Sequence, residues 1–98
     1  MIGGAAAPEG LVRGLEERHG LRTIKSWGMT ETAPVGTVDG QPGALLQLRA
    51  QNEAGPVPWD GATMGELEVR GAYVASAYYR PDDETGCFTD DGWFRTGD

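Results

Sequence analysis

A threonine and a glutamate stand side by side at positions 30 and 31, and these residue types suit the binding of a nucleotide phosphate. The threonine hydroxyl can donate a hydrogen bond to a phosphate oxygen, and the carboxylate can supply the hard oxygen ligand that Mg²⁺ shares with phosphates. Trp27 offers a flat face for stacking of a purine, and Gly28 leaves room for a ligand beside the backbone. Thr30 and Glu31 are therefore candidate phosphate and magnesium ligands.

Two more segments have the chemistry to complete such a site. The small residues of Gly3–Ala7 can form the other wall of a thin slot for a purine, and Asp98 can accept hydrogen bonds from both ribose hydroxyls. Taken singly, each residue also has a plain structural explanation: a strand-end tryptophan in the core, a solvated glutamate, or a Gly-Asp turn. Their order and combination, and not any one residue, indicate a site.

Local signals predict the elements that carry these residues. Pro8 and Glu9 suit the start of a helix, Leu11 and Leu15 recur at helical spacing, and Gly20 suits its end. A strand is expected from Leu21 to Trp27, because Thr23, Ile24 and Trp27 favour extended backbone. Residues 1–33 therefore read as an α/β segment, whose predicted parallel strand has no parallel partner in the sequence.

From Pro34 the chain reads as mostly β, with strands expected at Leu45–Arg49 and Glu66–Arg70. In the second of these strands the alternation places Leu67 and Val69 toward a core and the charged residues toward water. A short helical turn is expected at 81–85 and a turn at 90–92. The fold class is α/β, with a helix-strand unit followed by a mostly antiparallel β segment over residues 34–98.

Charge and composition narrow the class of protein. The chain carries 15 acidic and 8 basic residues, a net charge of −7, and it has no basic cluster, so nucleic acid is not an expected partner. Cys87 is the only cysteine and no metal-ligand spacing of Cys and His occurs, so a cytoplasmic location is expected. No apolar run approaches the roughly 20 residues of a membrane span. The patterned segment that stops at Asp98 suggests an internal piece of a longer protein.

Five motifs occur in order along the chain: Gly3–Pro8, Trp27–Thr32, Gly65–Gly71, Tyr78–Pro81 and Asp91–Asp98. This succession resembles the adenylate-forming superfamily of acyl-CoA synthetases, adenylation domains and luciferases. The wording of the second motif, with Val57–Gly61 ahead of the third, is most similar to medium- and long-chain fatty acyl-CoA ligases. The resemblance implies that both segments of the chain belong to the large N-terminal domain of that fold.

The resemblance also implies a reaction and roles for individual residues. In that family a carboxylate attacks the α-phosphate of ATP to give an acyl-adenylate, and the thiol of coenzyme A then displaces AMP. Thr30 would bind the α-phosphate and Glu31 the Mg²⁺. The remaining assignments are Trp27 bordering the adenine with Gly4, Ala5 and Ala6 opposite, Asp98 on the ribose hydroxyls, and Gly28 and Met29 beside the acyl pocket.

The chain also departs from the family pattern. The family's phosphate loop lies upstream of the matching region, and its hinge and catalytic lysine lie downstream, so the 98 residues alone are expected to be inactive. The stretch between Pro34 and Pro42 is shorter than in fatty acyl-CoA ligases. The expected substrates of the parent are fatty acid, ATP and coenzyme A, and contact of the parent with a membrane is expected only through its lipid substrate.

Other interpretations remain open at this point. The parent could be an amino-acid or aryl-acid adenylating enzyme. The chain could instead be a non-catalytic acidic module that binds a divalent ion, although its acids do not follow the spacing of an EF-hand loop. Those acids are Asp82, Asp83, Glu84, Asp90 and Asp91. We expect the isolated chain to have marginal stability at best.

Overall fold

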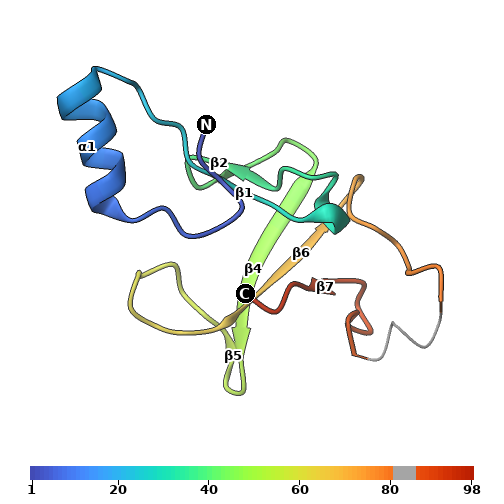
Figure 1. Ribbon diagram of the computed structural model, residues 1–98. Helices are drawn as coiled ribbons and strands as arrows, with labels where there is room; N and C mark the ends of the chain where they lie inside the picture. Colours follow the sequence, from blue (N-terminus) through green and yellow to red (C-terminus); the bar gives the residue numbers. More distant parts are fainter. Residues whose placement is uncertain (81–85) are drawn as a thin grey trace. The chain divides into compact units, whose positions relative to one another are not determined.

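The computed structural model describes residues 1–80 and 86–98, which fall into two units, Met1–Gly43 and Ala44–Asp98. The helical turn predicted at 81–85 lies outside the described residues. The first unit carries a helix and a small sheet, and the second carries a four-stranded sheet (Figure 1). Each unit is described by itself below.

The predicted helix is confirmed as α1, Glu9–His19. Pro8 lies just before the first turn in a non-helical conformation, with φ −58° and ψ 135°. Gly20 ends the helix in the left-handed region at φ 62°, and its N–H donates to the carbonyl of Glu16. Because the left-handed region costs glycine little, this residue type stops the helix at the predicted position. With 11 residues in α1, the described chain has no helix of the length and apolar character that a membrane span requires.

Gly14, in the middle of α1, tests how much the helix propensity of single residues contributes to stability. Nothing lies within 4 Å of the position that a Cβ on Gly14 would take. Gly14→Ala is therefore expected to raise the free energy of unfolding by about 0.5–1 kcal/mol, measured by urea denaturation. Gly20→Ala should instead lower it, because an alanine is strained at φ 62°. Equal effects of the two substitutions would contradict this account.

The first unit contains a three-stranded sheet in the order β1-β2-β3, with antiparallel neighbours. Its strands are β1 Ser26–Trp27, β2 Thr37–Val38 and β3 Gln41–Pro42. The strand predicted from Leu21 is thus reduced to its last two residues. The strand nevertheless ends at Trp27, as predicted, so the next residues follow the end of a strand.

The expectation that this strand lacks a parallel partner is wrong, because Ile2 forms a parallel bridge with Lys25. The N–H of Ile2 donates to the carbonyl of Ile24 at 2.8 Å, and the N–H of Ser26 donates to the carbonyl of Ile2 at 2.8 Å. A contact between residues so far apart in the chain carries no local sequence signal. The N-terminus therefore supplies one side of the strand and β2 supplies the other.

A two-residue turn at Asp39 and Gly40 joins β2 to β3, with φ values of 47° and 76°. Asp-Gly with positive φ at both positions is the favoured chemistry of a tight hairpin. Asp39 also fixes the hairpin to the first strand: its N–H donates to the carbonyl of Lys25 at 2.7 Å, and its Oδ1 accepts from the N–H of Lys25 at 2.9 Å. The stretch between Pro34 and Pro42, which the sequence analysis describes as short, ends in this hairpin.

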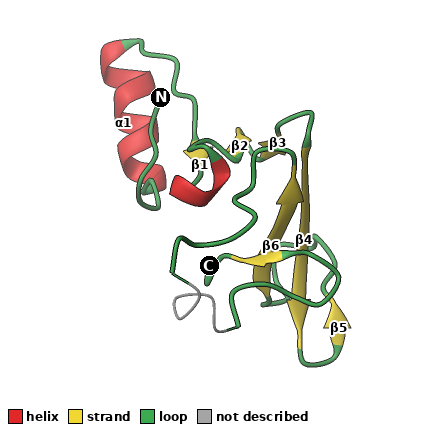
Figure 2. Ribbon diagram, turned by 90° about the vertical axis from the view of Figure 1, so that its right-hand side faces the viewer, coloured by secondary structure: helices red, strands yellow, loops and turns green. Residues whose placement is uncertain are grey.

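The second unit is an antiparallel sheet in the order β5-β4-β6-β7. Figure 2 labels β5, β4 and β6 of this sheet. The two long strands confirm the predictions made for this region. The strands are β4 Leu46–Asn52, β5 Gly55–Pro56, β6 Glu66–Gly71 and β7 Phe94–Arg95. The turn predicted at 90–92 is also present, since the N–H of Gly92 donates to the carbonyl of Thr89 at 2.9 Å.

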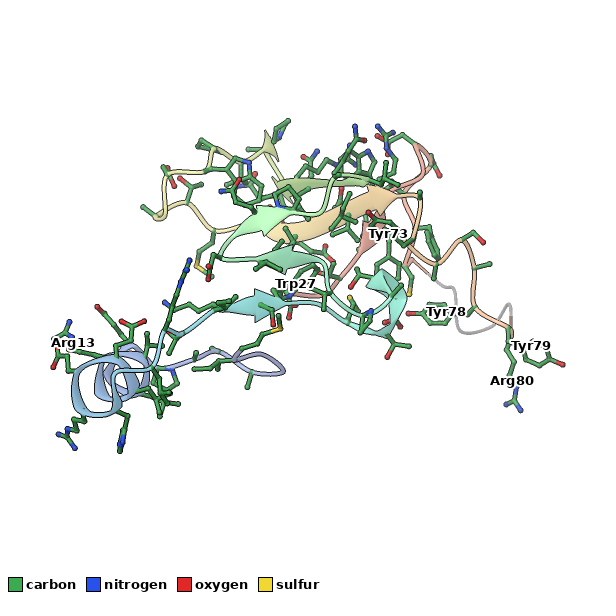
Figure 3. All side chains as sticks on the ribbon, turned by 90° about the horizontal axis from the view of Figure 1, so that it is seen from above. Arg13, Trp27, Tyr73, Tyr78, Tyr79 and Arg80 are labelled. Atoms are coloured by element: carbon green, nitrogen blue, oxygen red, sulfur yellow. The ribbon has the colours of Figure 1, made fainter. Side chains whose placement is uncertain are left out.

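The core of the second unit gathers around Val69 and Phe94, which are 0% and 2% exposed. The Phe94 ring lies 5.2 Å from that of Phe88 and 6.4 Å from that of Tyr78 between centroids. Tyr79, next to Tyr78 in the sequence, is fully exposed (Figure 3). The prediction that Val69 faces a core is confirmed, whereas Leu67 is only half-buried.

The prediction that the charged residues of β6 face water is wrong for Glu68, which is buried. Its carboxylate pairs with the guanidinium groups of Arg49 and, at 3.6 Å, Arg95. The guanidinium carbon of Arg49 also lies 4.3 Å from the centre of the Trp93 ring, and that of Arg70 lies 4.7 Å from it. This face of the sheet is therefore covered by an aromatic ring and paired charges, which the alternation of a single strand does not reveal.

Asp91 binds the same arginine from the turn before β7. Its two carboxylate oxygens accept from Arg49 at 2.9 and 3.3 Å, and Thr89 Oγ1 donates to it at 2.6 Å. These bonds, chiefly those from Arg49, lower the pKa of Asp91 to about 2.

A depressed pKa makes the stability contribution of Asp91 depend on pH in one direction. The contribution is present above the ordinary pKa of an aspartate and is lost as pH falls through about 2. We therefore expect the stability difference between the wild type and Asp91→Asn to shrink from pH 5 to pH 2, followed by urea unfolding at each pH. The pKa of Asp60 is also lowered, chiefly by the hydrogen bond from the Thr63 hydroxyl. Asp60 is present in both proteins, so its contribution cancels in the difference. A difference that grows toward acid pH would contradict the assignment.

Candidate functional site

The predicted phosphate residues lie in a closed loop that leaves β1 (Figure 3). The loop runs from Trp27 to Gly36, and the N–H of Gly36 donates to the carbonyl of Trp27 at 2.9 Å. Within it, Thr30–Thr32 form one turn of 3-10 helix, η1. Thr30 and Glu31 thus lie in a turn that follows the end of β1.

Exposure differs among the residues of this Trp27–Gly36 loop. Thr30 is exposed, whereas Trp27, Met29 and Glu31 are half-buried. Thr30 is therefore accessible to a ligand, and Glu31 is partly accessible.

Gly28 is required by the loop itself. A Cβ on this residue would lie 1.9 Å from the carbonyl oxygen of Pro34 and 2.8 Å from the N–H nitrogen of Gly36. The sequence reading explained this glycine by the approach of a ligand, whereas on the side where a Cβ would stand the chain's own backbone fills the space. A glycine at this position lets the loop fold back and present η1.

The Gly3–Ala7 loop starts beside the same strand. A Cβ on Gly3 would lie 2.6 Å from Ser26 Oγ, so the backbone of Gly3 runs directly against the residue before Trp27. Gly4 then turns the chain with a φ of 87°. Gly4, Ala5 and Ala6 are exposed. The first unit thus brings the start of the predicted adenine loop to the strand that ends in the predicted adenine platform.

The segment Thr96–Asp98 forms a second anchored turn, in the second unit. The Thr96 hydroxyl and N–H both donate to the carbonyl of Leu67, at 2.7 and 3.1 Å, and the N–H of Leu67 donates to the carbonyl of Asp98 at 2.9 Å. Thr96 Oγ1 also accepts from the N–H of Asp98 at 3.1 Å, and Gly97 has a φ of 77°. Asp98 is exposed at the end of a turn that β6 holds in place.

The predicted nucleotide residues are therefore divided between the two units. Gly4, Trp27, Thr30 and Glu31 belong to the first unit, and Asp98 belongs to the second.

The acidic module predicted as an alternative is described only in part. Asp82, Asp83 and Glu84 lie outside the described residues. Asp91 already accepts hydrogen bonds from Arg49 and Thr89. Among residues 1–80 and 86–98, no group of three or more His, Cys, Asp or Glu side chains is placed to hold a metal ion.

The sequence reading missed two residues that support these turns, Thr32 and Thr96. Both side chains bond to backbone groups of other residues: Thr32 to Met29 and Pro34, Thr96 to Leu67. A threonine close to a candidate ligand, in a turn, is a weak signal of such a role, because Ser and Thr hydroxyls commonly bond to nearby backbone. The partners themselves are visible only in the structure.

The whole chain aligns with curated CoA ligases. It is 32% identical over 120 residues to a 3-methylmercaptopropionyl-CoA ligase of Ruegeria lacuscaerulensis, covering 100% of this chain and 22% of the relative. It is 34% identical over 121 residues to a long-chain-fatty-acid–CoA ligase of Thermus thermophilus, with the same two coverages. Among solved structures, ATP-bound MatB of Rhodopseudomonas palustris superposes with a TM-score of 0.80 at 32% identity, over 98% of this chain and 21% of that one.

This chain is similar to acyl-CoA ligases in sequence and to adenylate-forming CoA ligases in structure. Its fold, a small α/β segment with antiparallel sheets, matches part of the fold of these ligases. No family model matches the chain.

The chain spans about 22% of the length of the CoA ligases it matches. The alignment with the Ruegeria ligase runs over 120 residues against the 98 of this chain, so about 22 positions (120 − 98) have no counterpart here.

Proposed function

We propose that this chain is an internal part of an ATP-dependent fatty acid–CoA ligase, which joins a carboxylate to ATP as an acyl-adenylate and then transfers the acyl group to coenzyme A. The observation that carries the proposal is the alignment of the whole of this chain with part of the CoA ligases. It is combined with an accessible Thr30 and with Glu31 on an anchored turn after β1. Homologues of one reaction type across the whole chain favour that type over a simple binding module.

In this proposal each half of the site binds a different part of the nucleotide. Thr30 donates to the α-phosphate, and Trp27 borders the adenine with Gly4, Ala5 and Ala6 opposite. Asp98 accepts from the two ribose hydroxyls, and Gly28 and Met29 border the acyl pocket. Because the developing charge lies on phosphate oxygens, fixed donors around them lower the barrier.

Magnesium fits the proposed site through Glu31. Mg²⁺ is commonly held by one or two carboxylates together with substrate phosphates. One half-buried carboxylate beside an exposed threonine hydroxyl provides that donor set. When bound, Mg²⁺ would neutralise charge on the phosphates during transfer.

The identity of the acid substrate is the most specific part of the proposal. The Thermus relative is named for long-chain fatty acids, and the sequence motifs also resemble fatty acyl-CoA ligases. The Ruegeria relative, at nearly the same identity, is named for the much smaller 3-methylmercaptopropionate. We propose a fatty acid, with its chain length to be set by experiment.

A chimera tests the function directly. Residues 1–98 would replace the matching segment of the Thermus thermophilus ligase, and release of pyrophosphate would be measured with ATP, Mg²⁺ and coenzyme A. The acids would be fatty acids of graded length, an aryl acid and an amino acid. We expect turnover with one or more fatty acids and little with the other two.

Two results would overturn the proposal. A folded chimera that releases no pyrophosphate with any acid would show that this segment does not support adenylation. Turnover confined to the aryl acid or the amino acid would retain adenylation and replace the fatty acid. The same enzyme with its native segment serves as the control for folding and assay.

A further inference from the structure

The structure distinguishes the two threonines that flank Glu31. Thr30 is exposed, whereas Thr32 is 1% exposed, although both belong to η1. A buried hydroxyl requires hydrogen-bond partners, because its desolvation is otherwise unfavourable. Thr32 therefore has a role that its neighbour does not share.

The Thr32 hydroxyl crosslinks the loop from inside. Its Oγ1 accepts from the N–H of Met29 at 3.0 Å. The same oxygen lies 3.0 Å from the carbonyl oxygen of Met29 and 3.3 Å from that of Pro34, and its one hydrogen donates to either of these acceptors. The backbone N–H of Thr32 donates to the carbonyl of Met29 at 3.0 Å. One side chain thus joins the residue before η1 to the residue that follows the turn.

These bonds hold a short turn that is followed by an unfavourable backbone conformation. Ala33, the next residue, adopts the left-handed region at φ 51°, which is unfavourable for a residue other than glycine. A further backbone bond runs from the N–H of Ala33 to the carbonyl of Thr30 at 3.2 Å. The Thr32 bonds to Met29 and Pro34 therefore bracket both the turn and the strained residue.

We infer that Thr32 is the positioning residue of the nucleotide site, whose buried hydroxyl holds η1 so that Thr30 and Glu31 face the phosphate and Mg²⁺. Thr32 itself does not touch the nucleotide. The inference rests on the proposed function, because it assigns the purpose of the turn that Thr30 and Glu31 occupy.

Two substitutions separate the hydroxyl from the volume of the side chain. Thr32→Val fills nearly the same space without a hydrogen-bonding atom, and Thr32→Ser keeps the hydroxyl and loses a methyl group. In the chimera, we expect Thr32→Val to weaken MgATP binding about tenfold by isothermal titration calorimetry, the lower end of the loss when a group that orients a ligand residue is removed. Thr32→Ser should bind within about twofold of the wild type.

A double substitution provides a readout that a purely structural role would not move. If Thr32 acts through Glu31, Thr32→Val should change MgATP affinity much less in the presence of Glu31→Gln than alone. In the full 98-residue chain, hydrogen exchange of the Met29 amide should accelerate with Thr32→Val and stay slow with Thr32→Ser. These results together would support the role.

The possible failures are distinguishable. A wild-type chimera that binds no MgATP overturns the proposed function and with it the role of Thr32 in binding. A chimera that binds MgATP, with unchanged affinity after Thr32→Val or with fully additive effects in the double variant, overturns the role of Thr32 alone. If Thr32→Val does not fold, Thr32→Cys replaces it, since a thiol is a weak donor and acceptor of similar size, and the same outcomes apply.

Discussion

Replacing Glu31 with glutamine in the chimera is expected to lower kcat/KM for ATP about a hundredfold, as when one preorganised group that stabilises transition-state charge is removed. Glutamine keeps the shape of the side chain and loses the charge, so it is a poorer ligand for a hard cation. The measurement is pyrophosphate release at several Mg²⁺ concentrations. Because the defect lies in holding Mg²⁺, a higher Mg²⁺ concentration should recover part of the lost rate.

A second glutamate provides the matched control. Glu53 is exposed in the turn between β4 and β5. Glu53→Gln removes the same charge and should leave kcat/KM within about twofold, since surface substitutions of this kind have small effects. Equal activity of the Glu31→Gln and Glu53→Gln variants would contradict the magnesium role of Glu31.

Truncation of Phe94 should have the largest effect on the fold. This side chain is 2% exposed and packs against the rings of Phe88 and Tyr78. Phe94→Ala leaves a cavity in the core of the second unit and should cost about 3–5 kcal/mol of unfolding free energy. Since whole domains are stable by only about 5–15 kcal/mol, the variant should lose most or all of its cooperative thermal transition, followed by circular dichroism.

Tyr79 gives the comparison for this prediction. It is an aromatic residue of similar size and is 99% exposed. Tyr79→Ala should shift the unfolding free energy by no more than about 0.5 kcal/mol. A Phe94→Ala variant that melts at the temperature of the Tyr79→Ala variant would mean that the second unit is not held together around Phe94.

The comparison of Thr30 with Thr32 shows the limit of sequence reasoning at the candidate site. Residue type indicated Thr30 and Glu31 as suitable ligands, and the predicted strand before them ended at Trp27. The sequence does not distinguish which threonine is buried, because burial depends on where the chain folds back. Gly28 is a similar case: its need for a small residue comes from Pro34, six positions later.

Glu68 and the parallel bridge between Ile2 and Lys25 show the same limit in the fold. Alternation along one strand predicts Glu68 in water, but Arg49 and Arg95, which come from other strands, pair with its carboxylate. Alternation correctly predicted Val69 in the core. The side of the sheet on which a residue lies follows from the two-residue repeat of its own strand.

The sequence by itself determined the elements whose signals are local. These are α1 with its glycine stop, the two long strands of the second unit, the turn before β7, and the order of motifs that indicates a CoA ligase. The tertiary structure alone decided which residues are paired or buried. Ile2 pairs with Lys25, Glu68 forms an ion pair with Arg49, and Thr32 is buried inside its loop. The physical reason is that helix caps, alternation and turn chemistry act within a few residues, whereas burial and ion pairing depend on segments that meet only after the chain has folded.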